Sequence, residues 1–339
     1  MTEPGRRLEA RSTFAGSEAG GALLFVLWIT AALTAIALAV ATTVRGETER
    51  TTASLDSLKA YYLATGAIER ALLYTGWAPS YRNPDGTSRY WNGESRMAFE
   101  FPTGEALVEI IPEAAKMNVN QAPPEDLYRL LLALGEGPER AREITLGIID
   151  WRTRPQSPEA MTPFDQFYLS RDPSFRARHA SLEEIEELLL VKGMTPELFY
   201  GGYERGAEGR LAARPGLVDC VSVYGATTQF DVNTAQPAVL EAIGLPPDSI
   251  ARIVEARRLM PFRDGRQLGG LGAELPGFNR LRIGGNSIFT FRATARLRTP
   301  GGALSETRRS AAAVVKFLSR RRFEERYHVL RWYDNAWVQ

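Results

Sequence analysis

The sequence predicts an α/β fold: one long N-terminal helix lies on an antiparallel sheet, and a large all-α insertion of helical hairpins interrupts that sheet. Three patterns predict it. An apolar stretch over residues 19–44 continues into a second helical pattern, residues 96–111 and 289–333 alternate as strands do, and residues 116–285 read as helices and loops. Because the helix needs an apolar sheet face to cover it, we expect the two outer segments to form one domain. The alternative, separate β, helical and β domains, leaves sheet edges bare.

The apolar stretch has the length and composition of a membrane span. No charged residue occurs between Glu18 and Arg45. At about 1.5 Å per residue, such a helix crosses a hydrocarbon core of about 30 Å. Only a helix satisfies its own backbone polar groups there, so we predict a transmembrane helix over residues 21–44. Three arginines and no lysine precede it, which favours a cytoplasmic N-terminus.

The helical pattern continues beyond the membrane edge. The chain contains no proline between Arg45 and Pro79, and an apolar stripe with helical spacing follows the charged segment. We predict that this stripe docks on the sheet. Its members are Leu55, Leu58, Tyr62, Thr65, Ile68 and Leu72.

Two ordinary interpretations compete for the N-terminal stretch. One is a simple signal anchor. The other is a removed secretion signal, because Ala39-Val40-Ala41 resembles a cleavage site of the A-x-A type. Against removal, the apolar run is longer than a usual signal core, and the helix continues through the cut.

Strands are predicted from period-two alternation bounded by turns such as Pro102–Gly104 and Thr299–Gly302. The expected strands cover residues 95–101, 107–111, 289–298, 311–317 and 327–333.

The helical block contains a repeat. Asn118–Pro124 recurs as Asp231–Pro237, and each copy combines a short extended piece, a polar cap candidate and a proline in the first helical turn. An apolar helix, a glycine-containing loop and another helix follow each copy. We predict two helical hairpins from an internal duplication, separated by a mobile loop at Gly201–Gly216.

Composition excludes several kinds of chemistry. A formal charge of +1 offers no general attraction to nucleic acid, and the single cysteine, Cys220, excludes a disulfide framework and a Cys-rich zinc site. His179 and His328 lie in different predicted domains, and no phosphate-binding glycine motif is present, so no enzyme is predicted. The densest group of carboxylates is expected to form a solvated helix face: Glu183, Glu184, Glu186 and Glu187.

The run GGALLFVLW, from Gly20 to Trp28, resembles the prepilin-type signal of pseudopilins. The resemblance implies that a peptidase cuts after Gly20, so that Gly21 becomes the first residue and the apolar helix stays on the mature chain. Phe25 is then the fifth residue, where most pilin-like subunits have a glutamate that pairs with the N-terminal amine of a neighbour. A carboxylate in hydrocarbon is costly unless paired, which is how it drives assembly. The assembly helix would begin with Ala22, Leu23, Leu24, Phe25 and Leu27.

Within the family, the absence of that glutamate resembles the K-type minor pseudopilin of type II secretion, which caps the filament tip. Further segments resemble the same family in the same order, over nearly the whole chain: Ile148–Arg152, Phe167–Leu169, Leu188–Met194, Thr195–Phe199 and Asp231–Pro237.

The resemblance implies a non-enzymatic tip subunit that initiates the pseudopilus and supports export across the outer membrane. It implies a single span in the inner membrane, a cytoplasmic N-terminus and a periplasmic bulk. The implied partners are the I-, J- and H-type minor pseudopilins, the prepilin peptidase, the inner-membrane assembly platform and the membrane, with no nucleic acid. The implied organisation is a leader at 1–20, the membrane helix at 21–44, a pilin-like domain from 45–115 and 286–339, and the inserted helical domain at 116–285.

Calcium is the one cofactor that the sequence leaves open. Asp150, Glu159, Asp165 and Asp172 offer oxygen ligands around one loop. The resemblance implies a calcium site after the Asp-Trp pair, but the corresponding loop here, Thr153–Ser157, lacks acids and contains an arginine, which opposes a dication. A surface loop without metal is the alternative.

A different class of function is also weighed. Asp231–Phe262 resembles the helix-hairpin-helix of DNA-binding proteins, in which backbone N–H groups bind a phosphate. Here two prolines in Gly244–Pro247 remove two such donors, while Arg252, Arg257 and Arg258 could contact phosphates. The alternative function is therefore a membrane-tethered helix-hairpin-helix DNA-binding protein.

Overall fold

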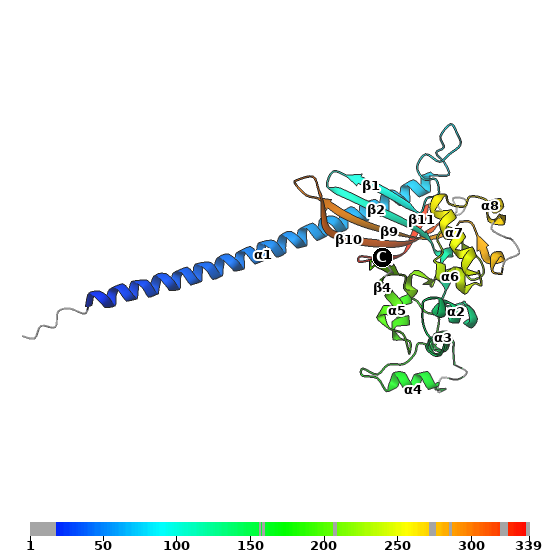
Figure 1. Cartoon of the computed structure of the whole chain (residues 1–339), viewed down its shortest axis with the longest axis horizontal. Coiled ribbons are helices and arrows are strands. Elements are labelled where there is room, and N and C mark those ends of the chain that lie inside the picture. Colours follow the sequence, from blue (N-terminus) through cyan, green and yellow to red (C-terminus); the bar gives the residue numbers. More distant parts are fainter. Residues whose placement is uncertain are drawn as a thin grey trace, which may run out of the picture. The chain divides into compact units, whose positions relative to one another are not determined.

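The computed structural model describes residues 18–155, 157, 160–205, 209–270, 276–284, 287–318 and 325–336 (Figure 1). The chain forms two units, Met1–Leu58 and Lys59–Gln339. Helix α1, Glu18–Trp77, contributes its first part to one unit and its last part to the other.

The first unit consists of helix alone in its described part. Of the described helices, α1 is the one long and apolar enough to cross a membrane, and its mean hydropathy over 18 residues reaches 2.5. Its threonines satisfy their hydroxyls locally. Thr30, Thr34, Thr42 and Thr43 each donate to a carbonyl three or four residues earlier, so they expose no unpaired donor to an apolar surrounding. The predicted uninterrupted helix is confirmed.

The second unit contains a five-stranded antiparallel sheet in the order β1-β2-β9-β10-β11. Strands β2 and β9 pair across the long intervening segment, with Val108 opposite Ala293. Strands from both sides of the insertion therefore share one sheet. The strands are β1 (Arg96–Phe101), β2 (Gly104–Pro112), β9 (Ile288–Arg298), β10 (Leu304–Phe317) and β11 (Tyr327–Tyr333).

The C-terminal part of α1 packs on one face of this sheet, but not through the whole predicted stripe. Ile68 and Leu72 are buried as predicted, whereas Leu55, Leu58 and Tyr62 are exposed. The buried helix face consists mainly of alanines, because a side chain of one carbon lets the helix backbone lie close to the sheet. The helix residues that pack on the sheet are Leu63, Ala64, Ala67, Ile68, Ala71 and Leu72, against a sheet face that includes Phe99, Val108, Phe291, Ala293, Ala311 and Val315. Ala60 is buried on the same helix.

The inserted segment is mainly helical, as predicted, with short strands in addition. Gly201–Gly216 was wrongly predicted as a mobile loop, since β4 (Gly202–Arg205) and β5 (Leu211–Arg214) pair in it as an antiparallel ladder. Two-residue parallel ladders join β3 (Met117–Asn118) to β6 (Val221–Ser222) and β7 (Phe230–Asp231) to β8 (Leu281–Arg282). The helices are α2 (Pro124–Ala133), α3 (Pro138–Arg152), α4 (Pro163–Leu169), α5 (Pro196–Tyr200), α6 (Pro237–Ala242), α7 (Pro247–Leu259) and α8 (Gly265–Gly269), with short 3₁₀ turns η1 (Glu113–Ala115), η2 (Ile185–Leu190), η3 (Leu217–Asp219) and η4 (Phe278–Arg280).

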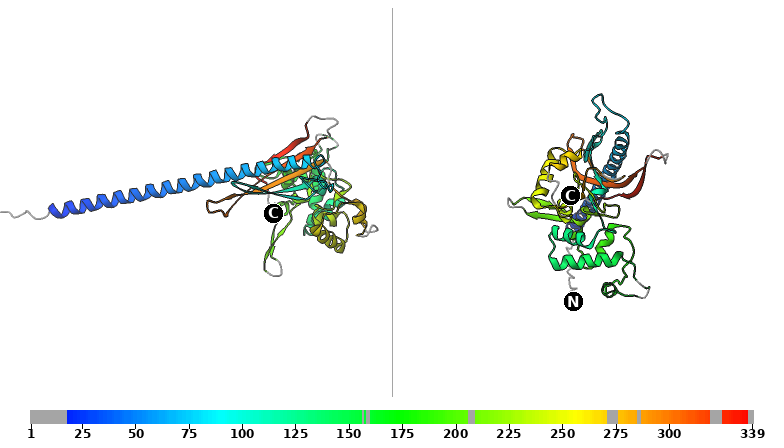
Figure 2. Two further views of the ribbon diagram at one scale, coloured as in Figure 1. Left: turned by 90° about the horizontal axis from the view of Figure 1, so that it is seen from above. Right: turned by 90° about the vertical axis from the view of Figure 1, so that its right-hand side faces the viewer.

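The predicted duplication is visible in the fold. The first copy is residues 117–190 and the second copy residues 230–270; Figure 2 shows them as neighbouring groups of helices, coloured green and yellow. In each copy the first helix ends at a glycine with a positive φ, Gly135 at 91° and Gly244 at 100°, a conformation that favours glycine. The two hairpins therefore turn in the same way.

Each copy is closed by an asparagine that makes two hydrogen bonds to one later residue. Asn120 accepts from Leu182 N at 2.7 Å and donates to Leu182 O at 2.9 Å. Asn233 accepts from Phe262 N at 2.8 Å and donates to Phe262 O at 3.0 Å. Such a pair of bonds defines both the distance and the direction of the returning chain.

A partly buried arginine completes each copy. Arg152 donates to the carbonyls of Val119 and Ala122, at 2.5 and 2.6 Å. Burial lowers the pKa of Arg152, and the same is true of its counterpart Arg257. The counterpart contacts are Arg257 with the carbonyls of Val232 and Ala235, at 2.9 and 2.7 Å.

Candidate functional site

The N-terminal helix presents a continuous apolar surface. Leu23, Phe25 and Trp28 are each about two-thirds exposed or more, at 72%, 66% and 74%. The predicted cleavage pair, Gly20 and Gly21, lies in the first turn of α1, whereas residues 1–17 lie outside the described part. A surface of this kind fits a single-pass membrane anchor.

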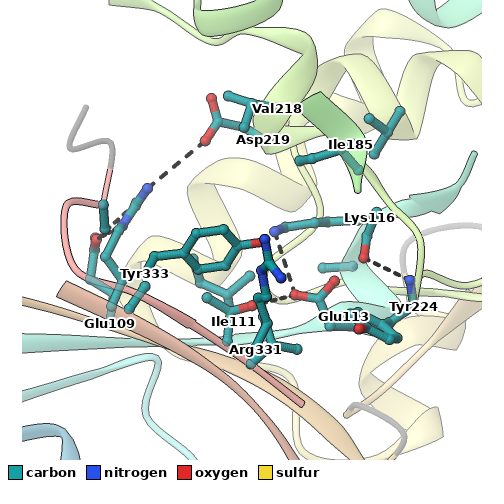
Figure 3. Close-up of a pocket in the computed structure, with 18 of the residues that line it drawn as sticks. Glu109, Ile111, Glu113, Lys116, Ile185, Val218, Asp219, Tyr224, Arg331 and Tyr333 are labelled. Carbon is teal, nitrogen blue, oxygen red and sulfur yellow. Dashed lines mark hydrogen bonds and ion pairs between the residues drawn. The ribbon is translucent and has the colours of Figure 1, made fainter. Parts of the chain in front are cut away.

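A cleft of about 990 Å³ lies between the outer face of the sheet and the inserted segment (Figure 3). Turn η1 places Glu113 in its wall, with only 1% of the residue exposed. Thr290 on β9 donates its hydroxyl to Glu113 at 2.5 Å, and Lys116 Nζ lies 3.4 Å from the same carboxylate. A buried carboxylate is stable only with such partners, so this group joins the sheet to the start of the insertion.

Two further arginines of the sheet reach the inserted segment across the cleft. Arg292 on β9 pairs with Glu109 at 2.9 Å and lies 4.0 Å from Asp219. Arg331 on β11 pairs with Glu184. These opposite charges hold the insertion against the sheet and leave acids and bases interspersed along the walls.

The carboxylate group at residues 183–187 was wrongly predicted as a solvated helix face. It lies at the start of the 3₁₀ turn η2, and Glu184, Glu186 and Glu187 are partly buried. Glu187 accepts from Trp151 Nε1 at 3.1 Å. The acids therefore satisfy donors from other elements, which a count of charges along the chain does not reveal.

Tyr333 lies in the cleft beside these acids. Burial, followed by the nearby Glu186, raises its pKa to about 12. One oxygen of Glu186 is buried without a hydrogen-bond partner among the described residues. The negative surroundings therefore oppose ionisation of the phenol.

We predict that Tyr333→Phe removes part of the alkaline loss of stability. A raised pKa means that the wild-type stability is complete below pH 10 and falls as the pH rises toward 12, because the unfolded tyrosine ionises first. Phenylalanine cannot ionise, so the wild type should lose on the order of 1–2 kcal/mol more than the variant across this range. Urea denaturation at several pH values measures this. The exposed Tyr62 provides the control, since Tyr62→Phe should follow the wild type; parallel curves for Tyr333→Phe and wild type would contradict the assignment.

A second polar cluster lies where α3 ends and α4 begins. Thr162 caps α4 and donates its hydroxyl toward Asp150 Oδ2 at 3.2 Å and Asp165 Oδ2 at 3.3 Å. His179 reaches the same place, with Nε2 at 2.9 and 3.1 Å from the two oxygens of Asp165 and Nδ1 at 3.0 Å from the carbonyl of Asp150. Two of the predicted calcium ligands are thus brought together, but around a histidine.

The pKa shifts in this cluster follow from burial and from these bonds. Burial raises the pKa of Asp150, since the bond from Thr162 offsets only part of it. Burial alone would also raise the pKa of Asp165, but the bonds from Thr162 and His179 outweigh it and lower the pKa. Burial alone would lower the pKa of His179, yet the bonds to Asp165 and Asp150 raise it. The arrangement favours an ionised aspartate beside a charged imidazole.

The residues at this cluster do not fit a calcium site. Calcium takes six to eight oxygen ligands, whereas the oxygens of Asp165 already accept from Thr162 and His179. Asp172 is exposed, and Glu159 lies outside the described residues. Within the described part of the chain, no group of three or more histidine, cysteine, aspartate or glutamate side chains is placed to hold a metal.

The hairpin that resembles a DNA-binding motif uses one of its three arginines internally, and the other two are exposed. Arg257 was wrongly considered as a phosphate contact, because its guanidinium is committed to two carbonyls of its own hairpin. Arg258 pairs with Glu255, and Arg252 bonds to Ser249. Of the three arginines, Arg257 is therefore the one that its hydrogen bonds withdraw from a phosphate-binding surface on α7.

Comparison with known proteins agrees with this fold. Residues 106–200 match the family model of protein K of the type II secretion system. The chain is 29% identical over 261 residues to type II secretion system protein K of Klebsiella pneumoniae, covering 72% of this chain and 74% of that protein. It is 29% identical over 199 residues to the protein K of Pectobacterium carotovorum subsp. carotovorum, covering 53% and 60%, and 28% identical over 167 residues to that of Pseudomonas aeruginosa PAO1, covering 49% and 45%.

Among solved structures, the chain resembles a chain of the GspK-GspI-GspJ complex of the type 2 secretion system from enterotoxigenic Escherichia coli. The TM-score is 0.50 at 18% identity, over 84% of this chain and 98% of that chain, which supports the fold. The apolar anchor, the antiparallel sheet and the inserted hairpins define a membrane-anchored, pilin-like subunit. The family model and the three relatives are each protein K of a type II secretion system, so the chain resembles this minor pseudopilin component in sequence as well as in fold.

Proposed function

We propose that this chain forms the tip of a type II secretion pseudopilus, where it initiates assembly and supports export across the outer membrane. The observation behind this proposal is α1, a helix of 60 residues whose first part is apolar on every side and has Phe25 where an acid would pair with a neighbour. In a head-to-tail assembly each interior subunit uses two different surfaces, whereas an end subunit uses one. A subunit without the acid lacks the means to insert beneath another, so it belongs at the end that forms first.

The inserted segment supports the same placement. It lies against the outer face of the sheet, held there by Arg292 and Arg331, and adds bulk beyond a helix-on-sheet subunit. Interior subunits of a filament have neighbours on both sides along the axis, while an end position leaves room for such a domain.

The expected partners follow from the anchor and from the relatives. The solved relative is part of a complex with GspI and GspJ. We propose that the apolar surface of α1 packs on the helices of the corresponding I- and J-type subunits, and of an H-type subunit. Before that, the prepilin peptidase would cut between Gly20 and Gly21, and the inner-membrane assembly platform would receive the helix, with the remainder of the chain in the periplasm.

The test is Phe25→Glu. An unpaired carboxylate in hydrocarbon costs about 2–3 kcal/mol, and a paired one would direct the chain into the filament interior. Either outcome reduces the number of filament starts, so we expect secretion to fall by roughly tenfold. The measurement is the amount of a secreted substrate outside the cells, together with co-purification of the minor pseudopilins. Phe25→Leu is the matched control and should secrete normally; normal secretion by Phe25→Glu would refute the tip assignment.

A further inference from the structure

The first copy of the hairpin contains an excursion that the second copy lacks. In the second copy, Arg257 donates to two carbonyls and Phe262 is bound by Asn233, and these two residues lie five positions apart. In the first copy the equivalent residues are Arg152 and Leu182, and the chain between them forms α4 and returns through His179. We call this additional segment between Arg152 and Leu182 the excursion, and its own side chains supply contacts to α3.

His179 is the residue that joins both ends of the excursion. Its backbone has a φ of 48°, in the left-handed region that non-glycine residues seldom adopt. That turn directs the ring to the carbonyl of Asp150 on α3 and to the carboxylate of Asp165 on α4. The side chains of His179 and Asp165 are only 14% and 7% exposed, so solvent screens this pair little.

Both partners of the ring are acceptors. A backbone carbonyl has no proton to donate, and an ionised carboxylate has none either. A neutral imidazole has a single N–H, whereas the structure places Nδ1 and Nε2 each at hydrogen-bond distance from an acceptor. Full satisfaction of these buried groups requires a proton on both nitrogens, which makes the ring a cation.

We propose that His179 supplies the positive charge that holds the excursion against α3, so that this segment needs no divalent cation. The charge lies beside Asp165, while Thr162 links Asp165 to Asp150 through one hydroxyl. A calcium ion would have to displace the ring and the hydroxyl from the same oxygens. The inference concerns the inserted segment and is independent of the tip assignment.

The first test compares thermal unfolding of the full-length, detergent-solubilised protein in EGTA, in calcium chloride and in magnesium chloride. We expect the wild type to unfold at the same temperature in all three. His179→Gln, which keeps a donor but not the charge, should unfold roughly 2–4 °C lower. His328, exposed on β11, offers the control, because His328→Gln should match the wild type. A wild-type stabilisation by calcium that magnesium does not reproduce overturns the proposal, as does a His179→Gln variant that unfolds with the control.

A second measurement does not depend on the variant being folded. The chain has two histidines, so selective ¹⁵N labelling of histidine rings gives two sets of signals in the full-length protein. We expect one histidine with both ring nitrogens protonated at neutral pH in EGTA. If both histidines show an unprotonated ring nitrogen under these conditions, His179 is not a cation and the proposal fails.

Discussion

Replacing Arg152 with methionine is expected to lower the free energy of unfolding of the inserted segment by about 2–4 kcal/mol. The guanidinium is the donor for two carbonyls, of Val119 and Ala122, that lie between the short strand β3 and helix α2. Methionine preserves most of the packing of the arginine stem but donates nothing, so both carbonyls lose their partner. Urea denaturation followed by tryptophan fluorescence measures the change, since Trp151 lies next to the mutated position and is buried.

The duplication provides a second site for the same experiment. Arg257→Met removes the equivalent donor from Val232 and Ala235, and should destabilise by a similar amount. Arg129 is the control, because it forms an exposed pair with Glu125 one turn away on α2, and Arg129→Met should change stability by less than about 0.5 kcal/mol. A loss no larger in Arg152→Met than in Arg129→Met would show that these partly buried arginines do not stabilise the hairpins.

The sequence predicted those parts of the fold that repeat along the chain. Apolar residues recur with helical spacing in the N-terminal helix and alternate in the strands, and a segment with a proline in the first helical turn occurs twice. The structure contains all three kinds of element. That the two outer segments form one domain was expected because the last part of α1 needs one sheet face to cover it, whereas the pairing of β2 with β9 was seen only in the structure. Even the duplication was visible, since the prolines and extended pieces recur at matching positions.

The sequence did not predict contacts between residues distant in the chain. Asp126 on α2 accepts two hydrogen bonds from Arg280 in η4, at 3.0 and 2.7 Å, although more than a hundred positions separate them. Neither residue has a local feature that marks it. The same holds for Glu113 and Thr290 in the cleft, which meet only because the sheet brings β9 beside the end of β2.

The cluster at Asp150 shows a different kind of limit. The group of acids and the family resemblance both suggested calcium, and the structure does bring Asp150 and Asp165 together. What spacing could not reveal is that His179 adopts a left-handed turn and places its ring between them. The contacts of the His179 ring, which come from distant positions in the chain, therefore could not be predicted from the spacing of the acids.

The predicted docking stripe of α1 was wrong at Leu55, Leu58 and Tyr62, because only large side chains were counted as apolar. Hydrophobic periodicity weights large side chains, so Leu58 and Tyr62 outweighed the buried Ala60, which lies two positions from each. Burial on a closely packed sheet instead favours the smallest side chains, since they permit the shortest distance between backbones.

Ala67→Leu should therefore destabilise the second unit by about 1–3 kcal/mol, although it makes the helix more hydrophobic and hardly changes helix propensity. Ala67 is fully buried in the core between α1 and the sheet, so three more carbons would have to displace neighbouring atoms. Leucine must push the helix off the sheet or adopt a strained rotamer. Ala53 on the same helix is exposed, so Ala53→Leu is the matched control and should leave the unfolding midpoint unchanged. Equal midpoints for the two variants would mean that the helix does not lie on the sheet through its alanine face.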